Sequence, residues 1–423
     1  MQSHPDLGRA GRGRCSRHRQ HLSEAGRNPP VTEHPTQKPL RVAMVGYAFM
    51  GAAHSQAWRT APRMFDLPLA PEMSVLVGRD EHRVGAAAQR MGWATTETDW
   101  RRVVERDDVD LVDICTPGDT HADIAIAALE AGKHVLCEKP LANSVDEAER
   151  MADAARTARE SGVRSMVGFT YRRVPAIALA KRLVEQGRVG QVRHVRAQYL
   201  QDWIADPEAP LSWRLDKKKA GSGALGDIGA HALDLAQFLT GDTVVEVSGN
   251  LRTFVTERPI ASDHAGLAGT ASSERGPVTV DDAASFLAQF AGGAMGVFEA
   301  TRFAYGRKNA LRIEINGSKG SLAFDFEDMN VLEFYDAAES SDTAGFRRIL
   351  ATEPEHPYVA AWWPPGHGLG YEHGFSHQVV DLVSAIAAGV DPTPSFDDGL
   401  QVQRVLDAVE TSSASRAWQT VPA

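Results

Sequence analysis

Between positions 39 and 170, short apolar runs alternate with longer segments whose apolar residues recur at helical spacing. The runs predict five buried strands: Leu40–Val45, Ser74–Val77, Asp110–Cys115, His134–Cys137 and Arg164–Phe169. The periodic segments predict helices over Ala52–Ala61, Glu81–Met91, Thr98–Glu105, Ala122–Ala131 and Ser144–Ser161. Repeated β-α units form a parallel sheet with right-handed crossovers, so an N-terminal Rossmann domain with a doubly wound parallel sheet is expected.

The second half of the chain is richer in long strands with alternating apolar and polar residues. The expected strands are Val192–Tyr199, Val244–Phe254, Ala283–Phe290, Ala294–Thr301, Asn309–Ile315, Ser321–Phe326 and Val331–Tyr335. Helices are expected over Pro175–Glu185 and over Phe396–Ser413. Two more are expected between them: one that starts at Ile228 and a later one that ends at Ala388. We expect the Gly-, Ser- and Ala-rich segment Arg258–Pro277 to be a flexible excursion. The fold class is therefore α/β, with a C-terminal α+β domain built on a large, mostly antiparallel open sheet.

Three segments follow from these patterns: a disordered tail over residues 1–38, a Rossmann domain over 39–170, and a substrate-binding and oligomerisation domain over 171–423. The tail carries six arginines among Gly, His and Pro, with few aliphatic residues. A start codon assigned too far upstream explains it equally well. A targeting role or a nucleic-acid arm is the less favoured alternative.

Composition narrows the class of protein. The 423 residues are 43% hydrophobic and 24% charged, as in globular proteins of two domains. A net charge of −10 argues against nucleic acid as a partner. The cysteines, Cys15, Cys115 and Cys137, form no CxxC pair, so reduced thiols in a cytoplasmic protein are expected. No apolar run approaches the roughly 20 residues of a membrane span, so no membrane partner is expected.

A glycine turn joins the first predicted strand to the first predicted helix. Strand, tight turn and helix are the context of a dinucleotide-binding fingerprint, and the helix N-terminus offers N–H groups to a pyrophosphate. An alanine replaces the middle glycine, so the turn alone fits an ordinary β-α connection equally well. The candidate cofactor contacts in it are Gly46, Ala48, Phe49, Met50 and Gly51.

Three other strand ends carry polar residues at the edge where parallel sheets bind ligands. Thr116-Pro117 and Glu138-Lys139 follow two of these strands. Arg79-Asp80 ends the second strand, where an acidic residue binds the ribose of NAD and an arginine accommodates the 2′-phosphate of NADP. The sequence leaves both NAD and NADP open.

Asp227 and His231 lie four residues apart in a predicted helix and share one helix face. A carboxylate there can orient the imidazole, whose ordinary pKa is close to neutral, as a general base for a hydroxyl proton. From spacing alone, a helix cap with a satisfied core histidine is an equally open interpretation.

An aromatic loop precedes the predicted helix that ends at Ala388. It runs from Trp362 to His373 and contains His367. Rings cover the apolar C–H faces of sugars and polar groups meet their hydroxyls, so His367 and His373 are candidate substrate contacts; an aromatic anchor packing the C-terminal helix is the alternative for Trp362. His373 and His377 have the spacing of a metal pair, but no helix-borne glutamate base accompanies them and no metal is predicted.

Several of these motifs together resemble one family. The run Gly46-Tyr47-Ala48-Phe49-Met50-Gly51-Ala52-Ala53-His54-Ser55, Thr116-Pro117 with His121, and Glu138-Lys139-Pro140 look like those of the Gfo/Idh/MocA oxidoreductases, from Leu40 onward. The resemblance implies that Lys139, in a candidate cis peptide with Pro140, lies beside the nicotinamide and binds the reacting oxygen. It implies that His231 is the acid/base with Asp227 nearby. His121 and Glu138 join the expected cofactor contacts.

The same resemblance bears on substrate and assembly. The runs Tyr199–Trp203, Trp213-Arg214 and Gly221–Asp227 look closest to the branch of levoglucosan dehydrogenase and related sugar 3-dehydrogenases. An NAD(P)-dependent dehydrogenase of a sugar, anhydrosugar or cyclitol is therefore expected. Its substrate contacts would include Tyr171, Arg172, Trp203, Trp213 and Arg214. The family's use of the open sheet for subunit contact implies a homodimer or homotetramer.

Two rival functions stay open at this point. One is a non-catalytic cofactor-binding regulator on the same fold, since fold does not determine function. The other is a different use of the cofactor, in an NAD-dependent glycosidase or in an imine or enone reductase.

Overall fold

The computed structural model describes residues 37–265 and 268–422, without the side chains of 261–272. The predicted tail, with Cys15, lies outside the described residues except for its last two positions. Within the described ranges, none of the helices has both the length and the apolar character required to cross a membrane.

The first half forms the predicted parallel sheet, with strand order β3-β2-β1-β4-β5-β6. Its strands are β1 Pro39–Val45, β2 Ala70–Val77, β3 Thr95–Glu97, β4 Leu111–Ile114, β5 His134–Cys137 and β6 Ser165–Val167. The intervening helices are α1 Phe49–Met64, α2 Glu81–Met91, α3 Trp100–Val104, α4 His121–Glu130 and α5 Val145–Glu160. The unpredicted strand β3 is only three residues long and has no apolar residue, so it carries no hydrophobic signal.

Helix α1 is longer than predicted at both ends. It begins at Phe49 inside the glycine turn, and it continues past Pro62 to Met64. Pro62 lacks an N–H, so the helix loses one main-chain hydrogen bond there and ends two residues later. The early start brings the N-terminus of α1 directly to the end of β1.

The second half contains a nine-stranded sheet with strand order β16-β15-β14-β13-β7-β12-β11-β8-β17. Only β7 and β12 pair in parallel; the other neighbours are antiparallel. The strands are β7 Val192–Leu200, β8 Val244–Arg252, β11 Ala283–Phe290, β12 Met295–Thr301, β13 Ala310–Gly317, β14 Gly320–Asp325, β15 Val331–Asp336, β16 Arg347–Leu350 and β17 Gln419–Thr420. The predicted open, mostly antiparallel sheet is confirmed, with β16 and β17 added at its edges.

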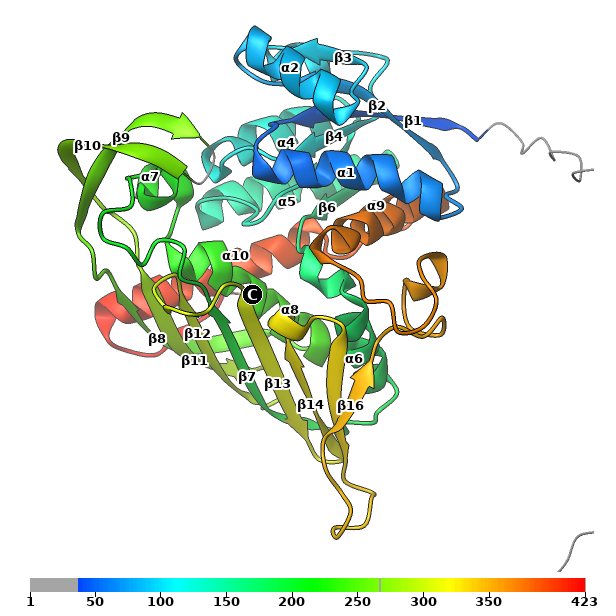
Figure 1. Ribbon diagram of the computed structural model, residues 1–423, viewed down its shortest axis with the longest axis vertical. Coiled ribbons are helices and arrows are strands. Elements are labelled where there is room, and N and C mark those ends of the chain that lie inside the picture. Colours follow the sequence, from blue (N-terminus) through cyan, green and yellow to red (C-terminus); the bar gives the residue numbers. More distant parts are fainter. Residues whose placement is uncertain (1–36, 266–267, 423) are drawn as a thin grey trace, which may run out of the picture. The chain divides into compact units, whose positions relative to one another are not determined.

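The helices of the second half are α6 Pro175–Glu185, α7 Lys217–Ala220, α8 Ala230–Thr240, α9 Tyr371–Ala388 and α10 Phe396–Ser415. Helices α8 and α10 pack on the nine-stranded sheet, through β7 and β8. Helix α10 also packs on α5, and α9 packs on α1, so both C-terminal helices return to the first half (Figure 1). One continuous apolar core, to which Val112, Phe286 and Val405 belong, joins the two sheets and fixes their strand ends relative to each other.

The expected flexible excursion over 258–277 was wrong. Strands β9 Glu257–Ala265 and β10 Ala268–Pro277 pair as a two-stranded antiparallel sheet. Arg258 is fully buried and donates to the main-chain oxygens of Ile204, Asp206 and Ala209. This anchor depends on contacts about 50 residues away, which the local Gly- and Ser-rich composition does not reveal.

Candidate active site

The glycine turn has no room for side chains at its two glycines. Gly46 has φ +102°, and a Cβ there would lie 2.8 Å from the main-chain oxygen of Cys115. A Cβ on Gly51 would lie 2.2 Å from the main-chain oxygen of Gly46. Helix α1 has no side-chain cap at Ala48 and no acidic residue in its first turn. Its first N–H groups and its positive dipole end are therefore available to a phosphate.

The end of β2 presents Arg79, which is exposed. The neighbouring Asp80 caps α2 and accepts a 2.9 Å hydrogen bond from the N–H of Arg83, so its carboxylate is already used by the helix. The charge of Arg79 reaches Asp119, in the turn after β4. Arg79 thus lies toward the same sheet edge as Thr116 and Pro117.

His121 is buried at the start of α4. Its Nδ1 lies 3.0 Å from the main-chain oxygen of Pro140, and its Nε2 lies 2.9 Å from that of Thr116. The ring therefore bridges the loops that follow β4 and β5, and it holds Thr116-Pro117 in register with Lys139-Pro140. This geometry supports a part in positioning the loops rather than direct contact with a cofactor.

Lys139 meets Asp227 across the two halves of the chain. Its Nζ donates to the main-chain oxygen of Asp227 at 2.5 Å and lies 3.4 Å from Oδ1 of the same residue. Its side chain is mostly buried, and the Lys139–Pro140 peptide is cis. An ammonium has three N–H bonds, so one is left for a substrate oxygen.

Asp227 is surrounded by cations. Nη1 of Arg302 donates to its Oδ2 at 3.2 Å, and Arg214 lies close enough to act on its charge. Burial by itself would raise the pKa of Asp227, but the charges of Lys139, Arg302 and Arg214 hold the pKa well below its usual value. Asp227 is therefore an anion that orders Lys139.

His231 is buried and neutral. Burial lowers its pKa well below the usual value, and the charge of Lys139 lowers it further, whereas Asp227 acts in the opposite direction. Its ring lies against Tyr171, with centroids 4.5 Å apart. Among the described residues, its Nδ1 has no hydrogen-bond partner. A neutral imidazole with a buried, unsatisfied nitrogen suits proton transfer with a ligand.

A π-helical turn, Leu225–Gly229, stands where the sequence predicts ordinary helix. It carries Asp227 and leads directly into α8, which carries His231. Such turns recur at functional sites because they change the direction of side chains within a helix. Here Asp227 bonds with Lys139 and Arg302, and it acts on His231 through its charge.

A chain of hydrogen bonds leads from Tyr171 to Trp203. The hydroxyl groups of Tyr171 and Tyr199 are 2.7 Å apart, and Tyr199 donates to Oδ1 of Asn309 at 2.6 Å. Gln201 also donates to that oxygen at 2.8 Å, and it accepts from Nε1 of Trp203 at 2.9 Å. The network fixes a polar and aromatic wall next to His231.

Two predicted substrate contacts, Trp203 and Trp213, each lie beside an arginine whose charge acts on Asp227. The guanidinium of Arg302 lies 5.7 Å from the ring of Trp203, and that of Arg214 lies 4.5 Å from the ring of Trp213. Arg172 is different, because it is buried and forms a bidentate pair with Asp234 at 2.9 and 2.5 Å. This ion pair supports a structural part for Arg172 rather than substrate contact.

Within the aromatic loop, Tyr371 reaches the site, with its ring centroid 6.5 Å from that of Tyr171 and 6.3 Å from that of Phe49, whereas the two histidines proposed as substrate contacts have only local partners. His367 is exposed and closes a local turn on the main-chain oxygen of Pro364. Nδ1 of His373 accepts from the N–H of Gly370 and caps α9. His377 is bonded to the oxygen of Arg173 and to Nε1 of Trp362, and burial lowers its pKa to about 3. Trp362 packs between these rings, which supports its interpretation as an aromatic anchor.

Glu138 belongs to a buried charge cluster that sequence reasoning missed. Its Oε1 lies 2.9 Å from Nε2 of His54, and both oxygens of Asp113 lie 2.9 Å from Nδ1 of the same ring. Arg302 was missed as well. His54 stood in the quoted glycine-turn run, but neither its spacing nor that of Arg302 reveals a partner 59 to 84 residues away.

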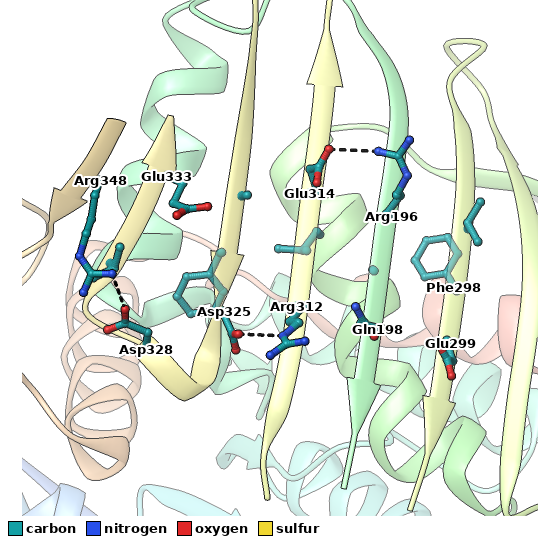
Figure 2. A pocket seen from close by; sticks show the side chains of 16 residues that line it. Arg196, Gln198, Phe298, Glu299, Arg312, Glu314, Asp325, Asp328, Glu333 and Arg348 are labelled. Carbon is teal, nitrogen blue, oxygen red and sulfur yellow. Dashed lines mark hydrogen bonds and ion pairs between the residues drawn. The ribbon is translucent and has the colours of Figure 1, made fainter. Parts of the chain in front are cut away.

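A separate hollow of about 540 Å³ lies on the outer face of the nine-stranded sheet. Charged pairs line it, including Arg196 with Glu314 and Arg312 with Asp325 (Figure 2). None of the predicted catalytic or cofactor residues lines this hollow. It is a feature of the exposed sheet face and not of the Lys139 site.

Two family models match the chain. The model described as an oxidoreductase family with an NAD-binding Rossmann fold matches residues 40–169, and the GFO/IDH/MocA C-terminal domain matches residues 177–323. Levoglucosan dehydrogenase of Pseudarthrobacter phenanthrenivorans is 43% identical over 388 residues, covering 90% of this chain and 98% of that protein.

Solved structures agree with these matches. The crystal structure of an oxidoreductase domain protein from Kribbella flavida is 74% identical, with a TM-score of 0.88 over 92% of this chain and 100% of that one. A structure of levoglucosan dehydrogenase in complex with NADH and levoglucosan is 42% identical, with a TM-score of 0.85 over 91% of this chain and 100% of that one.

Proposed function

Because this chain belongs to the Gfo/Idh/MocA family of NAD-binding oxidoreductases, we propose that it oxidises a secondary hydroxyl of levoglucosan or a related pyranose. The observation that carries the proposal is the meeting of Lys139 with Asp227 beside a neutral His231. Similarity to levoglucosan dehydrogenase over nearly the whole chain supports the anhydrosugar.

The turn from Gly46 to Gly51 fits a dinucleotide, because its glycines exclude side chains and the N-terminus of α1 is uncapped. In the proposal Ala48, Phe49 and Met50 contact the cofactor there, while Arg79 meets its adenosine half and Thr116 and Pro117 its nicotinamide half. The carboxylate of Glu138 is already bonded to His54 and to the N–H of Lys139, which gives no support to a cofactor contact. Bound NAD supplies the acceptor for the hydride that leaves the substrate carbon. NAD is preferred to NADP because NADH is bound in the related levoglucosan dehydrogenase structures.

Lys139 positions the reacting hydroxyl. Two of its N–H bonds are directed at Asp227, and the remaining one donates to the substrate oxygen. A cation at that oxygen stabilises the negative charge that grows as the hydroxyl loses its proton. Asp227 keeps Lys139 in place, and Arg302 and Arg214 keep Asp227 ionised.

His231 accepts the hydroxyl proton. Its lowered pKa keeps it neutral at physiological pH, so it is ready to act as a base. The burial of the ring against Tyr171 keeps water from competing for its unsatisfied nitrogen. In the reverse reaction the same nitrogen returns the proton.

The wall formed by Tyr171, Gln201, Trp203 and Asn309 is the proposed sugar subsite, together with Trp213 and Arg214. Aromatic rings suit the C–H faces of a pyranose, and the amides suit its hydroxyls. His367 and His373 stay predictions as substrate contacts. Their local bonds in the turn and cap give them no support.

A substrate panel tests the proposal. Purified protein is mixed with NAD or NADP and with levoglucosan, simple pyranoses and inositols, and the absorbance of reduced cofactor is followed. We expect reduction of NAD with levoglucosan or a pyranose. Tight NADH binding without turnover of any polyol would instead favour a non-catalytic regulator. Release of nitrophenol from a nitrophenyl glycoside without net reduction would favour a glycosidase.

We further propose that the outer face of the nine-stranded sheet joins copies of the chain as a homodimer or homotetramer. Its helices lie on one face, and Leu287, Met295 and Val297 are exposed on the other. Leu287→Glu combined with Val297→Glu should shift the protein to monomer in light scattering, whereas Thr157→Glu, at an exposed position of α5 away from this sheet, is the control and should leave the mass unchanged. An unchanged mass in the double variant would contradict the proposal that this surface joins the subunits.

A domain boundary near residue 170 and a cytoplasmic location also stay proposals.

A further inference from the structure

A buried charge cluster beneath the cofactor edge is not used by the proposed chemistry. His54 of α1 lies between Asp113 of β4 and Glu138 at the end of β5. The three residues are 1%, 0% and 5% exposed. Each ring nitrogen lies 2.9 Å from a carboxylate oxygen.

Between two ionised carboxylates the arrangement fits a charged imidazolium. Ionised carboxylates only accept hydrogen bonds, so both ring nitrogens must donate. Burial, the largest single influence, lowers the pKa of His54, but the charges of Asp113 and Cys115 and their hydrogen bonds to the ring together hold the pKa well above its usual value. The ring is also flanked by Cys115, which directly follows β4 and interacts with the imidazole, and by Phe375 of α9.

Both carboxylates are held from other sides as well. Asp113 accepts a 2.7 Å hydrogen bond from Nε1 of Trp58, and Oε2 of Glu138 accepts from the N–H of Lys139 at 3.3 Å. A Cβ on residue 168 would lie 2.7 Å from Oε1 of Glu138, so the observed position of the carboxylate depends on a glycine there. The position of the residue before Lys139 is therefore determined through His54.

The hydrogen bond between His54 and Glu138 joins the proposed cofactor-binding helix to the proposed substrate-binding loop. Helix α1 starts in the glycine turn that fits the cofactor phosphates, and His54 lies in its second turn. Glu138 directly precedes Lys139, the proposed ligand of the substrate oxygen. A rigid bond between them makes the placement of Lys139 depend on the placement of α1.

We propose that His54 is a positioning residue that couples the cofactor helix α1 to the Lys139 loop through its paired bonds to Asp113 and Glu138. The inference rests on the proposed function, in which Lys139 binds the reacting oxygen. Cofactor affinity and catalytic rate should therefore separate when the bridge is cut.

Three variants test the bridge. His54→Gln supplies an amide that can donate to Glu138 but places its oxygen against Asp113. Adding Asp113→Asn restores a donor to that oxygen and returns the cluster to its native net charge. Trp58→Phe is the matched control, because it removes another buried bond to Asp113 and leaves the bridge to Glu138 intact.

In H54Q we expect kcat to fall about 100-fold, because small misplacements of catalytic groups carry losses of that size. The Kd for NADH, measured by fluorescence titration, should change by less than about threefold. The kcat of the double variant should be at least about tenfold higher than that of H54Q, because the two substitutions act on one hydrogen-bonded cluster. Trp58→Phe should leave kcat unchanged.

The coupling is overturned if H54Q keeps the wild-type kcat. It is equally overturned if the folded double variant is as slow as H54Q, or if the Kd for NADH rises in proportion as kcat falls. Should H54Q not fold, a folded double variant still decides, since a kcat near that of the wild type supports the bridge and a strongly reduced one contradicts it.

A second measurement separates this inference from the proposed function. Absence of polyol turnover in the wild-type protein would refute the function alone. Hydrogen exchange of residues 138–142 tests the bridge without any substrate. We expect these amides to exchange at least about fivefold faster in H54Q than in Trp58→Phe, because local openings set exchange rates. Equal exchange in the two variants would refute the coupling.

Discussion

Two buried charge clusters meet at Glu138 and Lys139, and they are built in opposite ways. In the first, one cation, His54, lies between the carboxylates of Asp113 and Glu138. In the second, one carboxylate, Asp227, lies among the cations of Lys139, Arg302 and Arg214. The first is closed, because both ring nitrogens have partners. The second is open, because Lys139 has an N–H to spare and His231 has an unsatisfied nitrogen.

The difference separates positioning from chemistry. A fully bonded buried cluster has nothing left to offer a ligand, so its value lies in holding its parts rigidly. A cluster with unsatisfied groups is costly in the empty protein and gains its bonds when substrate arrives. Glu138 and Lys139 follow the same strand and are adjacent in sequence. Glu138 nevertheless belongs to the positioning cluster of His54, and Lys139 belongs to the cluster of Asp227 that the proposed chemistry uses.

The largest effect is expected from the open cluster. Lys139→Met removes the cation that binds the reacting oxygen, and kcat should fall about 1,000-fold, within the range for lost acid–base and electrostatic groups. Steady-state turnover measures it. Lys218→Met, on the exposed surface, is the control and should keep full activity. A Lys139→Met enzyme with normal turnover would contradict the assignment of the open cluster.

A smaller effect is expected for Arg302→Met. Asp227 loses one of its cations, so its pKa should rise and its hold on Lys139 should weaken, with a drop in kcat of about tenfold to 100-fold. Arg302 is fully buried and Asp227 is 29% exposed, so breaking this pair should also cost about 1 to 3 kcal/mol of folding stability, measured by denaturant unfolding.

The control for Arg302 is Arg312→Met. Arg312 forms a comparable pair with Asp325, but on the outer sheet face. Loss of that exposed pair should cost at most about 1 kcal/mol and leave kcat unchanged. Equal effects of the two substitutions would mean that burial beside Asp227 gives Arg302 no special part.

The smallest effect is on stability as a function of pH, and its sign should differ between the clusters. His231 has a folded pKa below its unfolded value of about 6.5, so the unfolded chain binds a proton first and stability falls as pH drops below that value. His377, with a pKa of about 3, acts in the same direction. His54 has a raised folded pKa, so its stabilisation is complete below about pH 6.5 and is lost as pH rises through the folded pKa.

Unfolding by denaturant across pH checks these signs. Each histidine should contribute a slope of about 1.4 kcal/mol per pH unit within its window. In H54Q the free energy of unfolding should no longer fall as pH rises into the alkaline range, whereas its fall at acid pH should persist. If H54Q loses the pH dependence of stability in both the acid and the alkaline range, or in neither, the distinction between the clusters is contradicted.

Much of the fold was predictable because it depends on local patterns. The β-α repeats, the glycine turn and the open antiparallel sheet are confirmed, as is membership of the family. The strand pair over 257–277 was missed because Gly- and Ser-rich composition does not show that Arg258 anchors it. Arg172 was expected at the substrate from the family resemblance, but its partner is Asp234, 62 residues away.

The sequence alone determined where Lys139 stands, at the end of a buried strand, and that Asp227 and His231 occupy one short helical segment. Local spacing suffices for such statements, since strand ends and helix faces repeat at fixed periods. Only the tertiary structure decided the partners: Arg302 for Asp227, and His54 between Asp113 and Glu138, at separations of 75, 59 and 84 residues. The charge state of each group follows from these partners and from burial, and both arise only when the two halves pack together.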